Sequence, residues 1–220
     1  MSTNIIQQFL SKSGEYRYYK IGDIVFNEAD SFSGLYYVLE GEVKIVKRGK
    51  EKNVLIWMAK AGELIGLQSF FLDTQKYSYS SVVTSDTAHL GFIPENVYSG
   101  LLDSNPAFKF DMSMELCKRI DYAEDRLKSF FKKSTKERFA EALIQFAEKG
   151  MSSGSKLQYK IARSQLDNLA DYVGTSLEYI LKLTREFKRK RLISDESKDY
   201  ISISDIDRLI QISGGGLMPT

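Results

Sequence analysis

The spacing of apolar residues changes at Pro106. From about Tyr16 to Ile93, short apolar runs are separated by glycines and charged residues, and after Pro106 apolar residues recur every three or four positions. A period of two is typical of strands with one exposed face, whereas a period near three and a half is typical of helices. Many short strands without helices between them favour an antiparallel sandwich or roll. The sequence therefore predicts an α+β fold, with an N-terminal antiparallel β-roll of the jelly-roll type before a long central helix.

Two glycine-containing turns punctuate the strand region. They lie at Glu40-Gly41 and at Arg48-Gly49-Lys50, and each is expected to join two strands as a hairpin. Apolar and polar residues alternate from Tyr37 to Lys47. The strands around the first turn are therefore expected to keep one face in water.

The helix expected after Pro106 carries a regular apolar seam. Its members recur at steps of 4, 3, 4 and 3, as Leu116, Ile120, Ala123, Leu127 and Phe130. A helix that pairs with its own copy shows such a seam, but a helix packed on the protein's own sheet would use the same one. The charged outer face and the length of the run favour pairing, so these five are the predicted dimerisation residues.

The sharpest local signal is a helix-turn-helix pattern between Ser164 and Ile193. Ala170 is small where a second helix would cross closely, and Gly174 can take the left-handed conformation that ends a helix. The apolar side chains expected to fill the space between the two helices are Leu166, Val173, Ile180 and Leu183. This arrangement places the N-terminus of a helix in a DNA major groove, although a helical hairpin can also be a purely structural corner.

Two helix starts are expected from capping residues. Thr135, with Arg138 three residues on, is expected to open a helix after the central one. Thr175 and Glu178 have the spacing of a capping box, which would start the second helix of the helix-turn-helix at once.

The residues expected to contact DNA lie on and beside that second helix. Ten residues, Lys182 to Arg191, carry six basic side chains against one acid, Glu186, which favours a polyanionic partner. The predicted contacts are Arg163, Ser176, Leu177, Glu178, Lys182, Arg185 and Lys188. Two short strands around a polar turn, Asp195 to Asp199, would form a wing beside the groove.

Composition argues against several other functions. A single cysteine, Cys117, and a single histidine, His89, exclude an internal disulfide and argue against a metal site, an iron–sulfur cofactor or a haem cofactor. No catalytic triad, phosphate-binding glycine loop or metal-ligand cluster supports an enzyme. The start of the chain lacks a secretion signal and no run approaches the ~18 apolar residues that span a bilayer. We therefore expect a cytoplasmic protein without a membrane partner.

In this order and spacing, the segments resemble the Crp/Fnr family of bacterial transcription regulators. The matching stretches are GDIVFNEAD, YYVLEGEVKI, GELIG, KERFAEALI and LADYVGTSLEYILK. The resemblance implies a β-roll like a cyclic-nucleotide-binding domain (residues 1–105), a central dimerisation helix (106–132) and a winged helix-turn-helix DNA-binding domain (133–220). It further implies a homodimer that reads palindromic double-stranded DNA, with RNA polymerase and an unidentified small-molecule effector as further partners.

The resemblance also exposes a degenerate effector pocket. In cyclic-AMP-binding members, a glutamate follows the turn glycine, Gly66 here, and an arginine with a Ser/Thr clamps the cyclic phosphate. The matching positions in this chain are Leu67, Gln68, Tyr77 and Ser78, and the Thr-Ser pair of the central helix matches Ala123 and Glu124. Loss of the guanidinium would remove a charge-assisted contact of about 1.5–3 kcal/mol. Cyclic AMP is therefore not the expected effector, and the pocket would hold a neutral or apolar ligand or be packed shut.

The recognition helix departs from the family as well. Many members carry Arg-Glu and then an arginine where this chain has Leu177, Glu178 and Lys182. Glu178 can accept from cytosine, Lys182 can donate to guanine, and Leu177 can only meet a thymine methyl, so an altered half-site is predicted. The rival hypothesis is an effector-binding module whose DNA contacts have decayed and which acts through protein partners.

Overall fold

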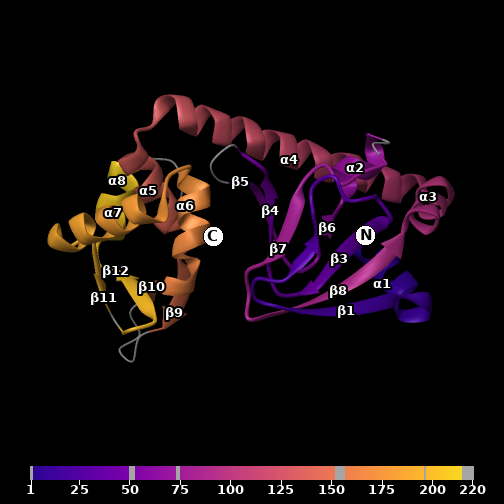
Figure 1. The fold of residues 1–220 in the computed structure, drawn as a ribbon, viewed down its shortest axis with the longest axis horizontal. Coiled ribbons are helices and arrows are strands. Elements are labelled where there is room, and N and C mark those ends of the chain that lie inside the picture. Colours follow the sequence, from indigo (N-terminus) through magenta and orange to yellow (C-terminus); the bar gives the residue numbers. More distant parts are fainter. Residues whose placement is uncertain (1, 50–52, 73–74, 152–156, 196, 215–220) are drawn as a thin grey trace. The chain divides into compact units, whose positions relative to one another are not determined.

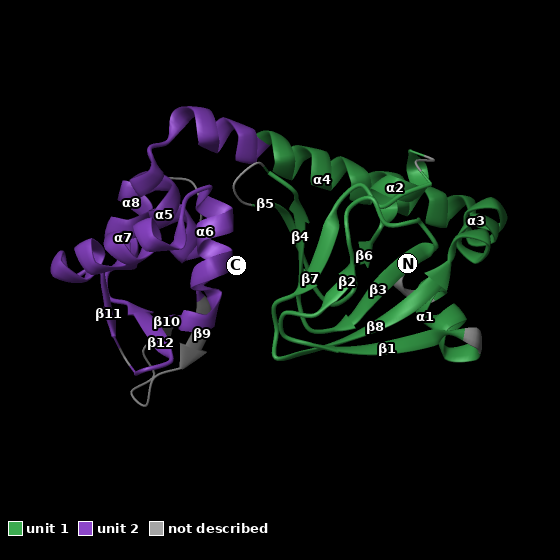
Figure 2. Ribbon diagram, viewed as in Figure 1, with its two compact units in different colours: residues 1–124 green, residues 125–220 purple. Residues whose placement is uncertain are grey.

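The computed structural model describes residues 2–49, 53–72, 75–151, 157–195 and 197–214. The chain divides into two compact units, residues 1–124 and residues 125–220 (Figure 2). The boundary falls inside helix α4, Pro106–Lys132, whose bounds are those predicted for the central helix. No helix in the described ranges is long and apolar enough to cross a membrane.

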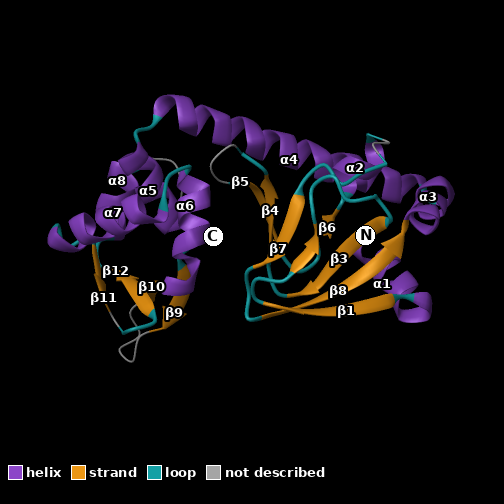
Figure 3. Ribbon diagram, viewed as in Figure 1, coloured by secondary structure: helices purple, strands orange, loops and turns teal. Residues whose placement is uncertain are grey.

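Unit 1 is built on two four-stranded antiparallel sheets (Figures 1 and 3). One sheet has the order β1-β8-β3-β6 and the other the order β2-β7-β4-β5. The strands are β1 Glu15–Lys20, β2 Ile24–Phe26, β3 Gly34–Glu40, β4 Val43–Lys47, β5 Val54–Ala59, β6 Leu64–Ile65, β7 Ser80–Val83 and β8 Thr87–Pro94. The predicted antiparallel β-roll is confirmed.

One of the two predicted hairpins is wrong. The chain does turn at Gly41, with φ of 90°, but β3 pairs with β8 and β6, whereas β4 pairs with β5 and β7. The turn therefore carries the chain from one sheet to the other. The second hairpin is confirmed, because β4 pairs with β5, although residue 50 of its turn lies outside the described residues.

Strand β3 is buried on both faces, which contradicts the expected wet face. One set of its side chains, including Tyr36 and Val38, packs in an inner core between the two sheets. The other set, including Leu35 and Tyr37, packs in an outer core under helices. These helices are α1 Ser2–Ser13, α3 Glu95–Ser104 and the first turns of α4. Apolar side chains on both faces of one strand require a cover on each side, and the helices supply the second cover.

Three helices of unit 1 were missed in the sequence, one of which is α3, directly after β8. Helix α1 precedes the first strand, and α2, Leu67–Phe71, interrupts the strand region directly after Gly66. The left-handed conformation of Gly66, with φ of 97°, lets the chain leave β6 and enter α2 at once. This short helix decides where the predicted pocket residues point.

Helix α4 is anchored to the roll of unit 1 by contacts within that unit. Arg119 donates a hydrogen bond to the carbonyl oxygen of Leu64. The rings of Trp57 and Tyr122 meet edge to face at a centroid distance of 4.7 Å. The first part of α4 is thus part of the same packed body as the sheets.

Unit 2 contains the helix-turn-helix and a four-stranded antiparallel sheet of order β11-β12-β10-β9. Its elements after α4 are α5 Thr135–Gln145, β9 Glu148–Met151, β10 Leu157–Ala162, η1 Arg163–Gln165, α6 Leu166–Val173, α7 Leu177–Arg189, β11 Ile193–Asp195, β12 Tyr200–Ile203 and α8 Ile206–Ile212. Strands β11 and β12 form the predicted wing, and residue 196 of its turn lies outside the described residues. Strands β9 and β10 were not predicted.

Candidate nucleic-acid interface and effector pocket

The turn of the helix-turn-helix is fixed by Gly174. Its φ of 73° and ψ of 40° are left-handed, and its amide donates to the carbonyl oxygen of Ala170 at 2.9 Å. A Cβ atom at this position would lie 2.5 Å from the ring of Phe130. The conformation and the space both require glycine, so the predicted role of Gly174 is confirmed.

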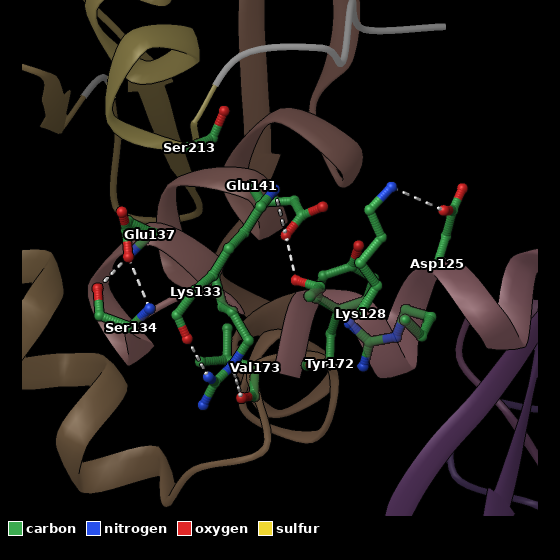
Figure 4. A network of polar contacts seen from close by, with 12 residues as sticks. Asp125, Lys128, Lys133, Ser134, Glu137, Glu141, Tyr172, Val173 and Ser213 are labelled. Atoms are coloured by element: carbon green, nitrogen blue, oxygen red, sulfur yellow. Dashed lines mark hydrogen bonds and ion pairs between the residues drawn. The ribbon is translucent and has the colours of Figure 1, made fainter. Parts of the chain in front are cut away.

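Two arginines hold the C-terminal end of α6. Arg126, from the last turns of α4, donates to the carbonyl oxygen of Tyr172 and lies 3.8 Å from the centroid of its ring. Arg138, from α5, donates to the carbonyl oxygen of Val173 at 3.0 Å (Figure 4). A helix leaves its last carbonyls without internal partners, and cations there also complement the helix dipole. The end of α6 is therefore set by α4 and α5.

A buried carboxylate ties α4 to α5 in the same unit. Glu141 is 7% exposed, accepts a hydrogen bond from Ser129 at 2.8 Å and forms an ion pair with Lys133 at 3.2 Å (Figure 4). A buried carboxylate is tolerated when it is paired and hydrogen-bonded in this way. The last turns of α4 thus belong to the same rigid packing as the helix-turn-helix.

Helix α7 begins one residue later than predicted. The cap is Ser176, whose hydroxyl accepts from the amide of Tyr179 at 3.3 Å, and not Thr175. Helix α5 begins at Thr135 as predicted, but its capping box is formed by Ser134 and Glu137 and not by Thr135 and Arg138. In both cases a second hydroxyl residue adjoins the predicted cap, and the structure uses that neighbour.

One face of α7 is buried and the opposite face is open. Ile180, Leu183 and Phe187 are buried, as are Leu166 and Val173 of α6, which confirms the predicted packing between the two helices. The predicted contacts Ser176, Leu177, Glu178, Lys182 and Arg185 are all exposed. The open face presents the first two turns of α7, and the positive end of the helix dipole there favours a phosphate.

Three further exposed residues of α7 were missed: Tyr179, Leu181 and Arg189. The Lys182 ammonium lies over the ring of Tyr179 at 5.6 Å. Tyr179 precedes Lys182 by three residues, so helical spacing could have placed it on the same face. Arg189 follows Arg185 by four residues, so the same helical spacing could have placed Arg189 on the face of Arg185.

The remaining two predicted contacts, Arg163 and Lys188, each form an ion pair with Asp195. Lys188 Nζ lies 2.6 Å from Asp195 Oδ1, and Arg163 pairs with the same oxygen. The hydrogen bond from Lys188, followed by the charges of Lys188 and Arg163, holds the pKa of Asp195 below its ordinary value. The single negative charge of Asp195 therefore offsets part of the charge of these two cations.

Only some of the cations in the basic run Lys182 to Arg191 are thus free to contact a polyanion. Glu186 accepts from Lys136 and lies 2.9 Å from Lys190, and the hydrogen bond from Lys136 leads the effects that lower the pKa of Glu186 to about 2. The cations of the run without an ion pair to any residue in the described ranges are Lys182, Arg185, Arg189 and Arg191. Lys182, Arg185, Lys188 and Arg189 line a shallow depression on the surface.

The structure separates the predicted pocket residues. Leu67 is fully buried in the outer core, whereas Tyr77 is buried in the inner core. Gln68 is exposed and Ser78 is half-buried, with its amide donating to Ser69 at 2.9 Å. Ala123 and Glu124 are exposed on α4. These residues do not converge on one cavity within unit 1.

Aromatic rings occupy the inner core beside Gly66. Tyr77 stacks on Phe26 at a centroid distance of 3.8 Å, and its hydroxyl donates to the carbonyl oxygen of Gly34 at 2.8 Å. The hydroxyl of Tyr79 accepts from the amide of Gly66 at 3.0 Å. Burial raises the pKa of both phenols, so they stay neutral donors and acceptors at physiological pH. The turn glycine Gly66 is thus held by Tyr79, and Tyr77 holds Gly34.

The predicted dimerisation residues fall into two groups. Leu116 packs against the outer core of unit 1, and Phe130 packs against Gly174 and lies under the guanidinium groups of Arg126 and Arg138. Ile120, Ala123 and Leu127 are exposed. The role of this seam in pairing remains a prediction.

Known proteins resemble this chain along most of its length. A family model of the cyclic nucleotide-binding domain matches residues 16–105, and a model of the Crp-like helix-turn-helix domain matches residues 137–212. The transcriptional activator protein anr of Pseudomonas aeruginosa is 25% identical over 202 residues, which cover 90% of this chain and 80% of that protein. The cAMP-activated global transcriptional regulator CRP of Haemophilus influenzae is 22% identical over 186 residues, with coverage of 83% and 81%.

Solved structures show the same fold. The c-di-GMP responsive global regulator CLP of Xanthomonas campestris matches with a TM-score of 0.77 and 19% identity, over 90% of this chain and 97% of that one. An antiparallel roll, a long helix and a winged helix-turn-helix with an open recognition helix define a two-domain, DNA-binding transcription regulator. The chain belongs to the Crp/Fnr family of such regulators. Its matched relatives are regulators and not enzymes.

Proposed function

We propose that this regulator binds a palindromic operator as a homodimer, with one α7 in each half-site, and that cyclic AMP is not its effector. The observation that carries the DNA part is the open face of α7, where the exposed helix start is followed along the helix by Lys182, Arg185 and Arg189. Cations on one helix face supply phosphate contacts, and the helix N-terminus places side chains against base edges. RNA polymerase would then be the partner through which the bound dimer acts.

The operator is expected to differ from the usual family half-site. Leu177, Glu178 and Lys182 are exposed together at the start of α7, and their chemistry favours a thymine methyl, a cytosine amino group and guanine acceptors. Selection of bound duplexes from a random pool tests this expectation. It should return a two-fold symmetric sequence, and Leu177→Arg should shift the preferred base at one position of each half-site. Recovery of the unmodified family consensus by the native protein would contradict it.

The placement of the pocket residues supports the proposal on cyclic AMP. The position of the family's ribose-binding glutamate is Leu67, in the outer core, and the position of its arginine is Tyr77, stacked in the inner core. A phosphate in this space would lose its guanidinium and would have to displace stacked rings. We infer that the roll is packed at this place, and that any effector is one that binds without an anionic group there.

Cyclic AMP is therefore expected to leave the thermal midpoint of the protein unchanged. A ligand that binds only the folded state raises stability by RT ln(1 + [L]/Kd), about 2.7 kcal/mol at one hundred times Kd. Scanning fluorimetry with cyclic AMP at millimolar concentration measures this, with a cyclic-AMP-binding family member as the positive control. A saturable rise in midpoint that Tyr77→Phe or Leu67→Ala changes would contradict the proposal.

The dimer is proposed to form through an exposed apolar stripe on α4. The stripe combines Ile120 and Leu127 of the predicted seam with exposed residues outside it, namely Phe110, Met114, Cys117 and Phe131. From Phe110 to Phe131 the members follow one another at steps of 4, 3, 3, 7 and 4, which keeps them on one face of the helix. Compared with the sequence-based seam, the stripe is rotated so that Leu116 and Phe130 face the protein's own cores.

Ile120→Asp is expected to weaken the dimer at least tenfold. The native side chain is 58% exposed in the single chain, and burying such a side chain at an interface contributes about 1.5–3 kcal/mol. Sedimentation across a concentration range measures the dissociation constant, with Lys118→Asp, outside the stripe, as the control. In the native dimer two copies of Cys117 should also cross-link on mild oxidation. Equal weakening by both substitutions, or no cross-link in a stable dimer, would contradict the proposal that this stripe forms the dimer interface.

A further inference from the structure

Asp195 lies where three elements of the DNA-binding unit meet. It ends the first wing strand, β11, and its Oδ1 atom accepts from Lys188 of α7 and from Arg163 of η1. The amide of Arg163 also donates to the carbonyl oxygen of Asp199 at 2.8 Å, which fixes Arg163 beside the wing. One carboxylate oxygen therefore holds two of the cations that adjoin the open face of α7.

This cluster is open to water and to ligands. The side chains of Asp195, Arg163 and Lys188 are 51%, 32% and 26% exposed. Exposed ion pairs are weak, because solvent screens them and the side chains lose freedom on pairing. A duplex that approached α7 could therefore compete for both cations. Lys188 also lines the same surface depression as Lys182, Arg185 and Arg189, so the cluster adjoins the cations that are already available.

We propose that Asp195 competes with DNA phosphates for Lys188 and Arg163, and so limits the sequence-independent affinity of the winged helix-turn-helix. This inference rests on the DNA-binding function proposed above. Each phosphate contact by a free cation releases a condensed counterion and adds affinity regardless of sequence. A cation that must first leave Asp195 adds less, and the carboxylate itself repels the phosphate. Base contacts by the start of α7 would then account for a larger share of total binding.

The pairing is not explained by stability alone. Asp195 is half-exposed, and the β11 backbone is already paired with β12 through the register Asp195↔Ile201. The fold of the wing therefore does not depend on the carboxylate charge, and Asp195→Asn keeps the size and the hydrogen-bonding oxygen of the side chain. An aspartate is ionised across the physiological range, and the hydrogen bond from Lys188 lowers the pKa of Asp195 further. Competition with phosphate would be constant and not a response to pH.

The test compares Asp195→Asn with Asp199→Asn in the full chain. Asp199 lies in the same wing, is exposed, and its carboxylate forms no ion pair with a residue in the ranges that the structure describes. Both substitutions change the net charge by the same amount. Binding to a duplex of random sequence is measured over a series of salt concentrations, with circular dichroism as the check of folding.

Asp195→Asn is expected to bind about tenfold more tightly than Asp199→Asn at low salt. Its log–log salt dependence should be steeper by about 0.9 for each cation released, or up to about 1.8 per protomer. Adding Lys188→Gln and Arg163→Gln to Asp195→Asn should remove the gain. Equal behaviour of the two asparagine variants, or weaker binding by Asp195→Asn, would overturn the inference. If neither the native protein nor any variant binds the duplex at all, the proposed DNA-binding function fails instead.

Discussion

Gly174→Val is expected to destabilise the DNA-binding unit by about 2–5 kcal/mol, of which the left-handed backbone contributes about 1–2 and overpacking about 1–3. The valine Cβ would lie 2.5 Å from the ring of Phe130 at a residue whose φ is 73°. Since whole domains are stable by only about 5–15 kcal/mol, a loss of this size is large. Hydrogen exchange of the α6 and α7 amides in the full chain measures it.

Gly62→Val separates the two causes. Gly62 has a φ of 94° but no atom within 4 Å of an added Cβ, so this control carries the backbone strain without the clash. We expect a loss of only about 1–2 kcal/mol there. If the two glycines respond equally, contact with Phe130 is not what requires glycine at the turn of the helix-turn-helix.

Arg126→Met is expected to cost about 2–4 kcal/mol in the same unit. Arg126 is 8% exposed and lies between the rings of Tyr172 at 3.8 Å and Phe130 at 5.0 Å. The change removes a desolvated cation–π contact of about 2 kcal/mol and a charge-assisted hydrogen bond of about 1.5–3 kcal/mol, offset in part because no charge remains buried. Urea unfolding of the full chain, followed by hydrogen exchange in α6, measures the loss.

Two variants sharpen this prediction. Lys128→Met, on an exposed side chain of the same helix, should change stability by less than about 0.5 kcal/mol. Arg126→Lys should not restore the native value, because an ammonium cannot stack on Tyr172 and donate to its carbonyl in the same geometry. Full restoration by lysine would show that charge alone holds the end of α6.

The helix-turn-helix was predictable because its constraints are local. Ala170 and Gly174 lie four residues apart, and the apolar side chains that pack around them recur at helical spacing. The exact helix starts were less certain, since Thr175 adjoins Ser176 and Ser134 adjoins Thr135, and either hydroxyl can cap.

The roll was predictable in class but not in its connections. A turn at Gly41 is visible in the sequence, yet whether the chain stays in one sheet or crosses to the other depends on strands far away. The second covered face of β3 likewise depends on α1 and α3, which no period-two pattern indicates. This is why Leu67 and Tyr77, predicted to share a pocket, lie in different cores.

The pairing of Arg163 and Lys188 with Asp195 was also invisible in the sequence. The three residues are separated along the chain and meet only when the wing folds back beside α7. Counting the basic residues of Lys182 to Arg191 therefore overestimates the available charge, since Lys188 and Lys190 are already paired.

Salt-dependent binding shows whether the open face of α7 lies against a DNA duplex. The native protein and the variant Lys182→Gln/Arg185→Gln are titrated with the selected operator over a range of salt concentrations. We expect weaker binding by the variant and a log–log slope shallower by about 1.8 per protomer, because two phosphate contacts are lost. Unchanged affinity and slope would contradict it, and would favour a module that acts through protein partners.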